Sequence, residues 1–309
     1  MSNQDNTPLL EIKDLSVKFR RYDRGLKQND LEVISNLSVS VYCGEILAVV
    51  GSSGSGKSLL AHAVLGILPS NAITSGMMYY DGQELSREKR EELRGHEIAL
   101  VPQSVSYLDP LMKIGEQVRG VKGSEEAQRK VFQKFELYPD TAAMYPFQLS
   151  GGMARRVLVS TAVIGNAQLI IADEPTPGLH PAIAEETIRH LRQLADEGRA
   201  VILITHELDL AFKVADKIAV FYAGTTVEVA AVQDFRKGGK ALRHPYSKAL
   251  WEALPENGFK PIPGFQPYAG HLPTGCLFAP RCQERTEECA NYIEMRELRG
   301  GTVRCLHAS

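Results

Sequence analysis

A glycine-rich segment lies between an apolar run and a helical pattern near the start of the chain. Residues 51–58 read Gly-Ser-Ser-Gly-Ser-Gly-Lys-Ser and directly follow the apolar residues 46–50. Phosphates carry several negative charges, and a tight loop can aim successive backbone N–H groups at them only where side chains stay out of the way. A helix that begins at the loop adds the partial positive charge of its N-terminus. The segment therefore predicts a phosphate-binding loop that joins a buried strand to a helix.

This loop offers the groups that a magnesium nucleotide needs. Lys57 can reach the outer phosphates, and the hydroxyl of Ser58 can ligate Mg²⁺. The candidate nucleotide-binding residues of the loop are Gly51, Ser52, Gly54, Ser55, Gly56, Lys57 and Ser58. The competing interpretation is a flexible Gly/Ser turn, which does not account for the strand, the glycine spacing, the Lys-Ser pair and the helix occurring together.

Short apolar runs alternate with helical patterns along the chain. The apolar runs cover residues 46–50, 169–172, 201–204 and 218–221, and helical patterns cover 58–68, ended by Pro69, and 182–197, ended by Gly198. Runs this short and uniformly apolar suit strands of a parallel sheet that helices cover on both faces. We therefore predict an α/β core. Residues 107–145 contain no such run and are expected to form helices and loops inserted in that core.

The two ends of the chain differ in residue pattern from the middle and from each other. In the first forty residues apolar and polar side chains alternate, which predicts two half-buried antiparallel strands around residues 15–19 and 37–41, with 20–30 as the connecting loop. From about residue 233, prolines recur and break the chain into short pieces. We expect residues 1–232 to form one domain and residues 233–309 a separate extension that is poor in regular structure.

Composition excludes several classes of protein. The chain has 309 residues, 44% of them apolar, and a net charge of −2, which gives no electrostatic reason to expect nucleic acid as a partner. The first ten residues, MSNQDNTPLL, lack the pattern of a secretion signal. No apolar run approaches the roughly 20 residues that a membrane-spanning helix needs. Any membrane role is therefore expected to come through partner subunits.

Two acids and a second glycine pair extend the predicted chemistry. The run 169–172 ends in Asp173 and Glu174; Asp173 can hold Mg²⁺ through water, and Glu174 can accept the proton of an attacking water. Ser150, Gly151 and Gly152 head a helical run and offer a second anion site, with a hydroxyl and two open amides. One phosphate loop needs no second anion site in its own chain. Two such chains are therefore expected to face each other, each lending this helix to the other's nucleotide.

With these motifs in place, the chain resembles the ATP-binding cassette proteins. The resemblance implies a RecA-like parallel sheet, an N-terminal antiparallel β subdomain and a helical subdomain at about residues 104–160. It implies that Gln103 senses the γ-phosphate or Mg²⁺ and touches membrane subunits, and that His206 contacts the γ-phosphate. Phe19 falls where the family stacks a ring on adenine, with Tyr22 as its rival. The implied catalytic residues are Glu174, His206 and Gln103, and the implied Mg²⁺ ligands are Ser58, Gln103 and Asp173.

Three further features are similar to the oligopeptide, dipeptide and nickel importer group. They are Met153 after Ser-Gly-Gly, the sequence His-Pro-Tyr-Ser-Lys-Ala-Leu at 244–250, and the cysteine-bearing segment 273–307. The resemblance implies an ATP-hydrolysing subunit of a bacterial or archaeal importer, at the cytoplasmic face of the cell membrane. The implied partners are a second, different ATPase subunit, two integral membrane permease subunits and an extracytoplasmic solute-binding protein. Peptide is the expected cargo, with nickel or a metal chelate as alternatives.

Four of the five cysteines lie in the last 34 residues, separated by five, six and fifteen residues. In a chain without an export signal, a metal or cluster site is favoured over disulfides. The close cysteine pairs of zinc ribbons are absent, and the importer resemblance agrees with a structural [4Fe–4S] cluster, with zinc or free thiols as alternatives. The expected ligands are Cys276, Cys282, Cys289 and Cys305. Cys43, beside Gly44, is expected to be a small buried side chain.

One segment departs from the usual cassette pattern. After Glu174 the chain reads Pro-Thr-Pro-Gly-Leu-His180, where most of the family has Ala-Leu-Asp. In the family this loop helps to form the ATP site of the facing subunit, so His180 is expected to alter the rate or the symmetry of hydrolysis there. The same segment resembles excision-repair cassette proteins, so a soluble DNA-repair ATPase is the alternative function. A single cassette and the lack of a basic bias argue against it. A regulatory cassette protein that joins no transporter is a further alternative, which the importer-like C-terminal segment disfavours.

Overall fold

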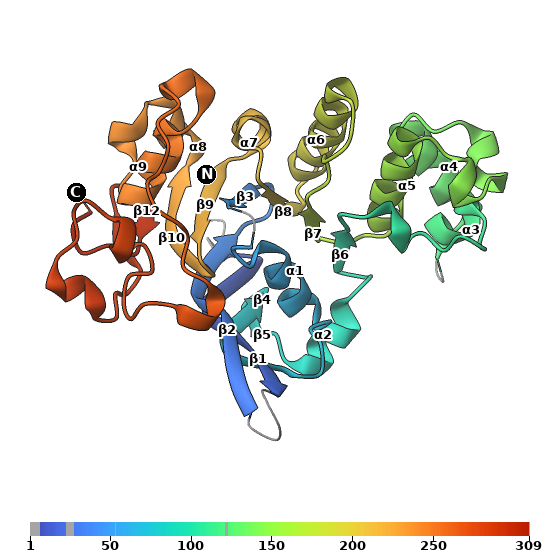
Figure 1. Ribbon diagram of the computed structural model, residues 1–309. Coiled ribbons are helices and arrows are strands. Elements are labelled where there is room, and N and C mark those ends of the chain that lie inside the picture. The colour runs from blue at the N-terminus through green and yellow to red at the C-terminus, as the bar shows by residue number, and fades with distance from the viewer. Residues whose placement is uncertain (1–6, 23–27, 53, 121–122, 309) are drawn as a thin grey trace.

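Two β-sheets organise the structure, a computed structural model that describes residues 7–22, 28–52, 54–120 and 123–308 (Figure 1). The smaller sheet is antiparallel, with strand order β2-β1-β4-β5. Its strands are β1 (Leu10–Tyr22), β2 (Gln28–Val41), β4 (Ala72–Tyr80) and β5 (Gln83–Glu84). This confirms the two antiparallel strands that the alternation of the first forty residues predicts.

The larger sheet has the order β11-β12-β10-β9-β3-β8-β7-β6. Its strands are β3 (Ile46–Gly51), β6 (Ile98–Val101), β7 (Leu169–Asp173), β8 (Ala200–Thr205), β9 (Lys217–Tyr222), β10 (Thr225–Ala231), β11 (Arg296–Leu298) and β12 (Gly301–Val303). The strands from β9 to β6 pair in parallel, whereas β10, β12 and β11 continue the sheet antiparallel. All four apolar runs are strands of this sheet, so the predicted α/β core is confirmed.

The helices of the described residues are α1 (Lys57–Leu65), α2 (Arg87–Leu93), α3 (Ile114–Arg119), α4 (Glu125–Lys134), α5 (Gly151–Val163), α6 (Pro181–Asp196), α7 (Leu208–Val214), α8 (Val232–Arg236) and α9 (Pro245–Glu252). Of these, α1 packs on one face of the larger sheet, and α6 and α7 pack on the other. No helix in the described ranges is both long and apolar enough to cross a bilayer.

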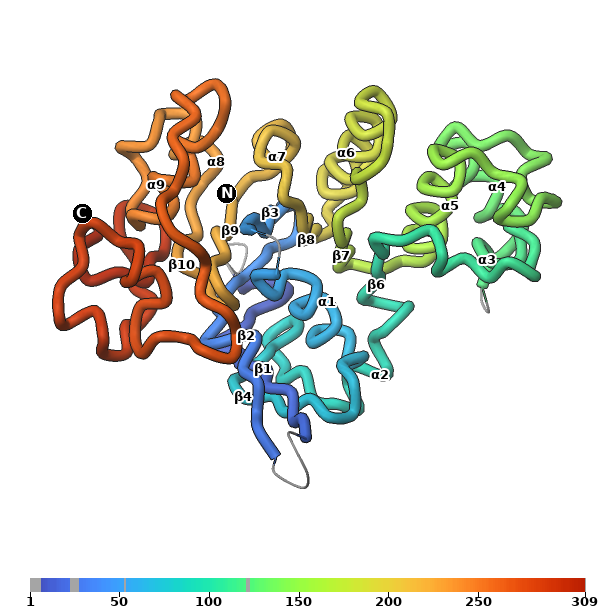
Figure 2. Tube along the Cα trace, in the orientation of Figure 1, coloured from blue at the N-terminus to red at the C-terminus, as the bar shows by residue number. Residues whose placement is uncertain are grey.

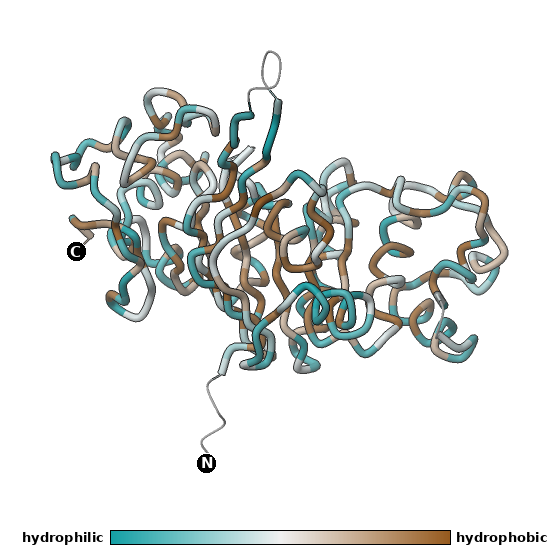
Figure 3. Tube along the Cα trace, turned by 90° about the horizontal axis from the view of Figure 1, so that it is seen from below, coloured by the Kyte–Doolittle hydropathy of each residue, from teal (hydrophilic) through white to brown (hydrophobic). Residues whose placement is uncertain are grey.

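The central strand β3 divides the core into two layers. Ile46, Ala48 and Val50 face the layer with α6 and α7, while Leu47 and Val49 face α1 and the antiparallel sheet. Side chains on a strand alternate between faces, so an entirely apolar strand implies burial on both sides. Figure 3 shows this as hydrophobic tubes at the centre of the molecule, with hydrophilic segments toward the periphery. The phosphate-binding loop follows β3 and is therefore attached to the most buried part of the fold.

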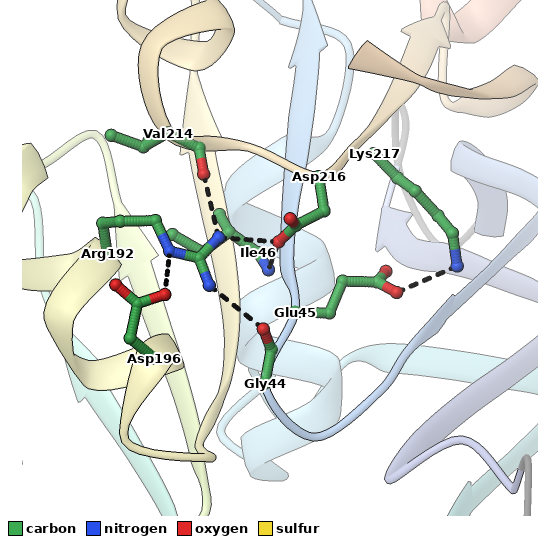
Figure 4. Close-up of polar contacts among 8 residues, drawn as sticks. All are labelled: Gly44, Glu45, Ile46, Arg192, Asp196, Val214, Asp216 and Lys217. Atoms are coloured by element: carbon green, nitrogen blue, oxygen red, sulfur yellow. Dashed lines mark hydrogen bonds and ion pairs between the residues drawn. The ribbon is translucent and has the colours of Figure 1, made fainter. Parts of the chain in front are cut away.

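Arg192 of α6 fixes the start of β3 (Figure 4). Its guanidinium donates to the carbonyl oxygen of Gly44 at 3.0 Å and to the Asp216 carboxylate at 2.7 Å. The same carboxylate accepts the backbone N–H of Ile46 at 2.8 Å. Charge-assisted hydrogen bonds of this kind are stronger than neutral ones. They lock the strand that carries the phosphate-binding loop to the helix and strand beside it.

The helical region α3–α5 has a core of its own. Figure 2 shows these helices at one end of the molecule, beyond β6, with the C-terminal extension at the other end. The residues of this core are Leu108, Ile114, Val118, Phe132, Leu137, Ala154, Val157 and Leu158. This confirms that residues 107–145 are helices and loops.

Several local predictions are wrong. The strands β1 and β2 extend into residues 20–30, where cross-strand pairs such as Arg20 with Asp30, 3.3 Å apart, continue the ladder; residues 23–27 of that loop lie outside the described residues. The helix after the phosphate-binding loop ends at Leu65, before Pro69, because Gly66 adopts a left-handed conformation with φ 67° and caps it. Cys43 is exposed rather than buried.

The C-terminal extension packs on the sheet of the preceding domain. Strand β12 pairs with β10, and the buried side chains of Tyr246, Leu277 and Phe278 belong to the same core as β3 and α6. Most of the extension's regular structure is short, consisting of α9, several 3₁₀ turns and the β11–β12 hairpin. The extension therefore shares a hydrophobic core with the larger sheet.

Candidate nucleotide-binding site

The phosphate-binding loop has the backbone geometry that its glycines predict; Ser53 lies outside the described residues. Gly51 passes so close to β9 that an added Cβ would lie 2.4 Å from the carbonyl oxygen of Phe221. Gly56 has φ 86° and precedes α1 as its N-cap. Both positions require glycine, because a side chain would clash at the first and be strained at the second. The loop therefore turns tightly from β3 into the N-terminus of α1.

Lys57 is buried, with 5% of its surface exposed, and folds back onto the loop. Its Nζ donates to the carbonyl oxygens of Gly51 at 2.9 Å and Ser52 at 3.1 Å. Burial lowers the pKa of Lys57, while the charges of Glu174 and Asp173 act in the opposite direction. Phosphate oxygens could replace the two carbonyls as partners of this ammonium group and would match its charge better.

Two oxygen-bearing side chains meet beside the loop. The hydroxyl of Ser58 donates to Oδ1 of Asp173 at 3.1 Å, joining the first turn of α1 to the end of β7. Asp173 is buried, and burial raises its pKa, partly offset by this hydrogen bond. A hydroxyl and a carboxylate are hard oxygen donors, the type that Mg²⁺ prefers. These two residues fit a Mg²⁺ ion on chemical grounds.

Glu174 is the meeting point of three segments. Its Oε2 accepts a hydrogen bond from Nε2 of Gln103 at 3.0 Å, and its Oε1 lies 3.4 Å from Nδ1 of His206. Gln103 follows β6 and His206 follows β8, so the carboxyl ends of neighbouring parallel strands bring all three together. Ligand sites of open α/β sheets form at this edge. Glu174 itself has φ 43°, a left-handed conformation that is uncommon outside glycine.

The other predicted nucleotide residues lie apart from this group. Ser150 caps α5, accepting the N–H of Met153 at 3.3 Å, and Gly151 is exposed next to it. Helix α5 belongs to the helical region, which β6 separates from α1 (Figures 1 and 2). Phe19 is half-buried and packs against the core shared with α1, whereas Tyr22 is 67% exposed near the end of β1.

Arg155 is a site residue that the sequence does not reveal. It lies on α5, is buried, and donates to the carbonyl oxygens of Pro102 at 2.8 Å and Gln103 at 2.7 Å. Burial lowers its pKa. The side chain therefore ties the helix that begins at Ser150 to the segment that carries Gln103. Only the contact with residues 102 and 103 identifies this role. In the sequence, the consecutive residues Arg155 and Arg156 are typical of a solvent-exposed helix face.

The predicted cysteine site is not assembled as a metal-binding group. In the described ranges no three or more His, Cys, Asp or Glu side chains are placed to hold a metal ion. Cys289 and Cys305 are buried, Cys276 and Cys282 are half-buried, and all are free thiols. Burial is the main cause that raises the pKa of Cys276 to about 11, and the neighbouring charges of Cys305 and Cys282 contribute. Cys289 and Cys305 likewise act on the thiol of Cys282, so the four thiols lie in one neighbourhood of the extension.

Comparison with known proteins adds independent information. The family model described as ABC transporter matches residues 34–177, and the one described as oligopeptide/dipeptide transporter, C-terminal region, matches residues 227–289. The oligopeptide transport ATP-binding protein OppD of Haemophilus influenzae is 34% identical and covers 96% of each chain. The dipeptide transport ATP-binding protein DppD of Escherichia coli is 35% identical over 91% of this chain and 90% of that protein.

Solved structures agree on the cassette part. A dimeric ATP-binding cassette in a post-hydrolysis state, bound to ADP and Pi, has a TM-score of 0.61 and 26% identity, covering 72% of this chain and 98% of that one. The ATP-binding subunit of an ABC transporter has a TM-score of 0.60 and 25% identity, covering 74% and 92%.

Proposed function

Because this chain belongs to the family of ATP-binding subunits of oligopeptide and dipeptide ABC transporters, we propose that it hydrolyses ATP at the loop 51–58 to drive solute import. The observation that carries this proposal is the convergence of Gln103 and His206 on Glu174, beside the Ser58–Asp173 pair. A water-activating carboxylate and a Mg²⁺ site at one sheet edge are the parts that phosphoryl transfer to water requires. The DNA-repair alternative is not favoured, since the relatives are importer subunits.

The binding roles follow from the chemistry of each group. The loop amides from Gly51 to Gly56 and the ammonium group of Lys57 bind the phosphates, and Phe19, with Tyr22 as the alternative, stacks on the adenine. Ser58, Asp173 and Gln103 would hold Mg²⁺, which would draw charge from the phosphate oxygens when bound. The proposed Mg²⁺ site explains why two oxygen donors, Ser58 and Asp173, meet beside a buried lysine.

The catalytic roles follow from the geometry around Glu174. Its carboxylate accepts the proton of the attacking water, while Gln103 and His206, each against one carboxylate oxygen, orient it. Hydrolysis at this site is thereby linked to the segment of Gln103, which Arg155 ties to α5.

A second ATPase subunit completes the site in this proposal. Ser150, Gly151 and Gly152 lie away from the loop of their own chain. Ser150 and Gly151 are exposed at the start of α5, with Gly152 buried behind them, and a helix start of this kind suits the phosphates of a nucleotide held by a facing subunit. We place the pair at the cytoplasmic face of the membrane, with a different ATPase chain as partner, two permease subunits and an extracytoplasmic binding protein. Peptide is the proposed cargo, with nickel or a metal chelate as alternatives.

The substitution Glu174→Gln tests the catalytic assignment. We expect the variant to bind Mg-ATP as tightly as the wild type and to lose hydrolysis by a factor of about 10² or more, because the amide cannot accept the proton. ATP binding is measured on the purified chain, and hydrolysis in the assembled transporter. Unchanged turnover would reject Glu174 as the base, and no binding of Mg-nucleotide by the wild type would reject the whole function.

The iron–sulfur assignment is a separate proposal. What supports it is the common neighbourhood of four free thiols, with the backbone N–H of Cys276 bonded to the carbonyl oxygen of Cys289 at 2.8 Å. Against it, the thiols are not placed as a ligand set. Iron and acid-labile sulfide analysis of anaerobically purified protein decides the matter: about four of each per chain supports a [4Fe–4S] cluster. Zinc alone supports the alternative, and neither element rejects both.

A further inference from the structure

A segment of the C-terminal extension reaches back to the phosphate-binding loop. Residues 262–268, here called the strap, run beside β10 toward β2 and α1 (Figures 1 and 2). Gln266 of the strap accepts, on its side-chain Oε1, a hydrogen bond from the hydroxyl of Ser52. Tyr246 of α9 also hydrogen-bonds to Ser52, which partly offsets the rise that burial causes in the pKa of this tyrosine. Two residues of the extension therefore contact the loop.

Arg281 fixes the strap at one end. Its guanidinium donates to the carbonyl oxygens of Ile262 at 2.9 Å and Pro263 at 2.7 Å, and to the hydroxyl of Tyr222 at 3.3 Å. It also lies 5.9 Å from the ring centre of Phe278. One charged group thus binds the strap backbone to β9 and to the aromatic core of the extension.

The other end of the strap rests on the antiparallel sheet. A short 3₁₀ helix, Ala269–His271, follows the strap directly and packs on β2. A backbone segment anchored at both ends has few conformations available, so less backbone entropy is lost when one of its side chains forms a contact. Gln266 is therefore held against Ser52 by the path of the backbone on both sides of it.

Ser52 connects the strap to the lysine of the loop. Its hydroxyl pairs with Gln266, and its carbonyl oxygen accepts Nζ of Lys57 at 3.1 Å. When Lys57 turns to a phosphate, the loop loses that internal hydrogen bond while its amides must keep their direction. The contact with Gln266 is independent of Lys57 and remains available to hold Ser52 in place.

We propose that Gln266 is a positioning residue of the nucleotide site, which the extension supplies through the strap and which keeps the phosphate-binding loop in its nucleotide-binding shape. The proposal rests on the proposed function, because it needs nucleotide to bind at residues 51–58. It makes nucleotide affinity depend on a contact more than two hundred residues away in the chain. The extension then acts on the ATP site in addition to packing on the sheet.

A double-mutant cycle with Ser52→Ala and Gln266→Ala tests the contact, with Mg-ADP as the probe and its dissociation constant as the readout. Loss of one neutral hydrogen bond predicts binding weakened by about 2- to 10-fold in Gln266→Ala. In the Ser52→Ala background the same change is expected to have no further effect, because the partner is already gone. Arg281→Gln, which releases the strap without touching the loop, is expected to weaken binding in the same direction.

The matched control is Gln283→Ala, which removes an exposed glutamine elsewhere in the extension and is expected to leave the dissociation constant unchanged. Equal affinity of wild type and Gln266→Ala overturns the inference, as do independent, additive penalties in the cycle. A lower melting temperature of nucleotide-free Gln266→Ala with unchanged affinity also overturns it, because that result describes a structural role only. Failure of the wild type to bind Mg-ADP instead overturns the proposed function itself.

Discussion

Glu174 holds a left-handed backbone conformation at the end of β7, with φ 43°. For a residue with a side chain this conformation costs about 1–2 kcal/mol. Its backbone N–H is bonded to the carbonyl oxygen of Ile204 at 2.9 Å, and its carboxylate meets Gln103 and His206. These contacts hold the strained turn in place. The strain and the position of the carboxylate thus have one local origin, the turn that ends β7.

His244 gives a prediction at the residue scale. It is fully buried, its Nδ1 caps α9 by accepting the N–H of Tyr246 at 3.0 Å, and burial, with a smaller effect of Lys248, lowers its pKa to about 3. Because the pKa of His244 is lower in the folded protein than in the unfolded chain, the unfolded chain binds the proton more tightly. The free energy of unfolding therefore falls as pH decreases from about 6.5 toward 3, by up to about 1.4 kcal/mol per pH unit. Denaturant unfolding at pH 7.5, 6 and 5 measures this slope.

The control for this slope is His244→Asn, because asparagine also caps helices but does not titrate. Other groups contribute equally to both proteins, so the difference between wild type and variant isolates His244. The variant is expected to lose less stability between pH 6.5 and 5 than the wild type. Parallel pH profiles would show that His244 is not neutral in the folded protein.

At the scale of elements, α5 and the segment after β6 are joined by Arg155. We expect Arg155→Met to retain Mg-ADP binding and to lower ATP hydrolysis in the assembled transporter by about 10-fold or more. The reason is that the carbonyl oxygens of Pro102 and Gln103 lose the donors that fix this segment, so Gln103 no longer holds its position against Glu174. Arg129→Met, an exposed change on α4, is the control. Normal hydrolysis in Arg155→Met would remove the proposed link.

The turn between β9 and β10 gives a stability prediction. Gly224 has φ 92°, its carbonyl oxygen accepts the N–H of Ser35, and an added Cβ would lie 2.2 Å from the carbonyl oxygen of Val33. Gly224→Ala is therefore expected to lower the free energy of unfolding by at least about 2 kcal/mol. Gly95→Ala, with φ 76° and open space around it, isolates the backbone strain alone, at about 1 kcal/mol. Equal losses in both variants would contradict the steric argument.

The sequence predicts elements best where the environment is uniform. The four apolar runs are strands because both faces of the sheet are covered, and α6 matches its predicted pattern closely. Strand β6, Ile98–Val101, is a four-residue apolar run of the same kind as the others, but it is not among the predicted strands. The three-residue strands β11 and β12 are too short for any periodicity; β12 forms on the edge of β10, and β11 pairs with β12.

The site was predictable where the chemistry needs particular backbones or spacings. The glycines and Lys57 of the loop, and the acids after β7, follow from what phosphate and Mg²⁺ require. The roles of Arg155 and Gln266 depend on contacts with distant segments, and no local pattern marks them. The predicted cysteine site is not found as a ligand set among the described residues, because the spacing of cysteines along a chain does not determine how their thiols are oriented in the fold.

At the scale of the whole molecule, the extension and the cassette sheet are joined by a buried ionic network. Arg243 of the extension pairs with Glu228, which lies on β10; the distance from Nη1 of Arg243 to Oε1 of Glu228 is 3.1 Å. The side chains are 1% and 0% exposed, respectively. Arg243 also pairs with Asp234 at 3.0 Å and donates to the carbonyl oxygens of Leu298 and Arg299 in the β11–β12 hairpin. One guanidinium therefore links the sheet, α8 and the end of the chain.

This network predicts that the extension and the cassette unfold together. Trp251, the single tryptophan, lies on α9, so its fluorescence reports on the extension while circular dichroism reports on the whole chain. In the wild type both signals are expected to change at the same denaturant concentration. Fluorescence that changes at a lower concentration than circular dichroism would show that the extension unfolds independently.

Removal of the Arg243 guanidinium tests which contact makes the extension and the cassette unfold together. Arg243→Met leaves Glu228 buried without its guanidinium. Its remaining partners among the described residues are the backbone N–H groups of positions 243 and 244, at 2.9 Å. We expect the free energy of unfolding to fall by about 3–5 kcal/mol, seen equally by both signals. Adding Glu228→Gln is expected to restore part of this loss, because the unpaired buried charge is the larger penalty. If the double variant is less stable than Arg243→Met, the hydrogen bonds of Glu228, rather than its charge, join the extension to the sheet.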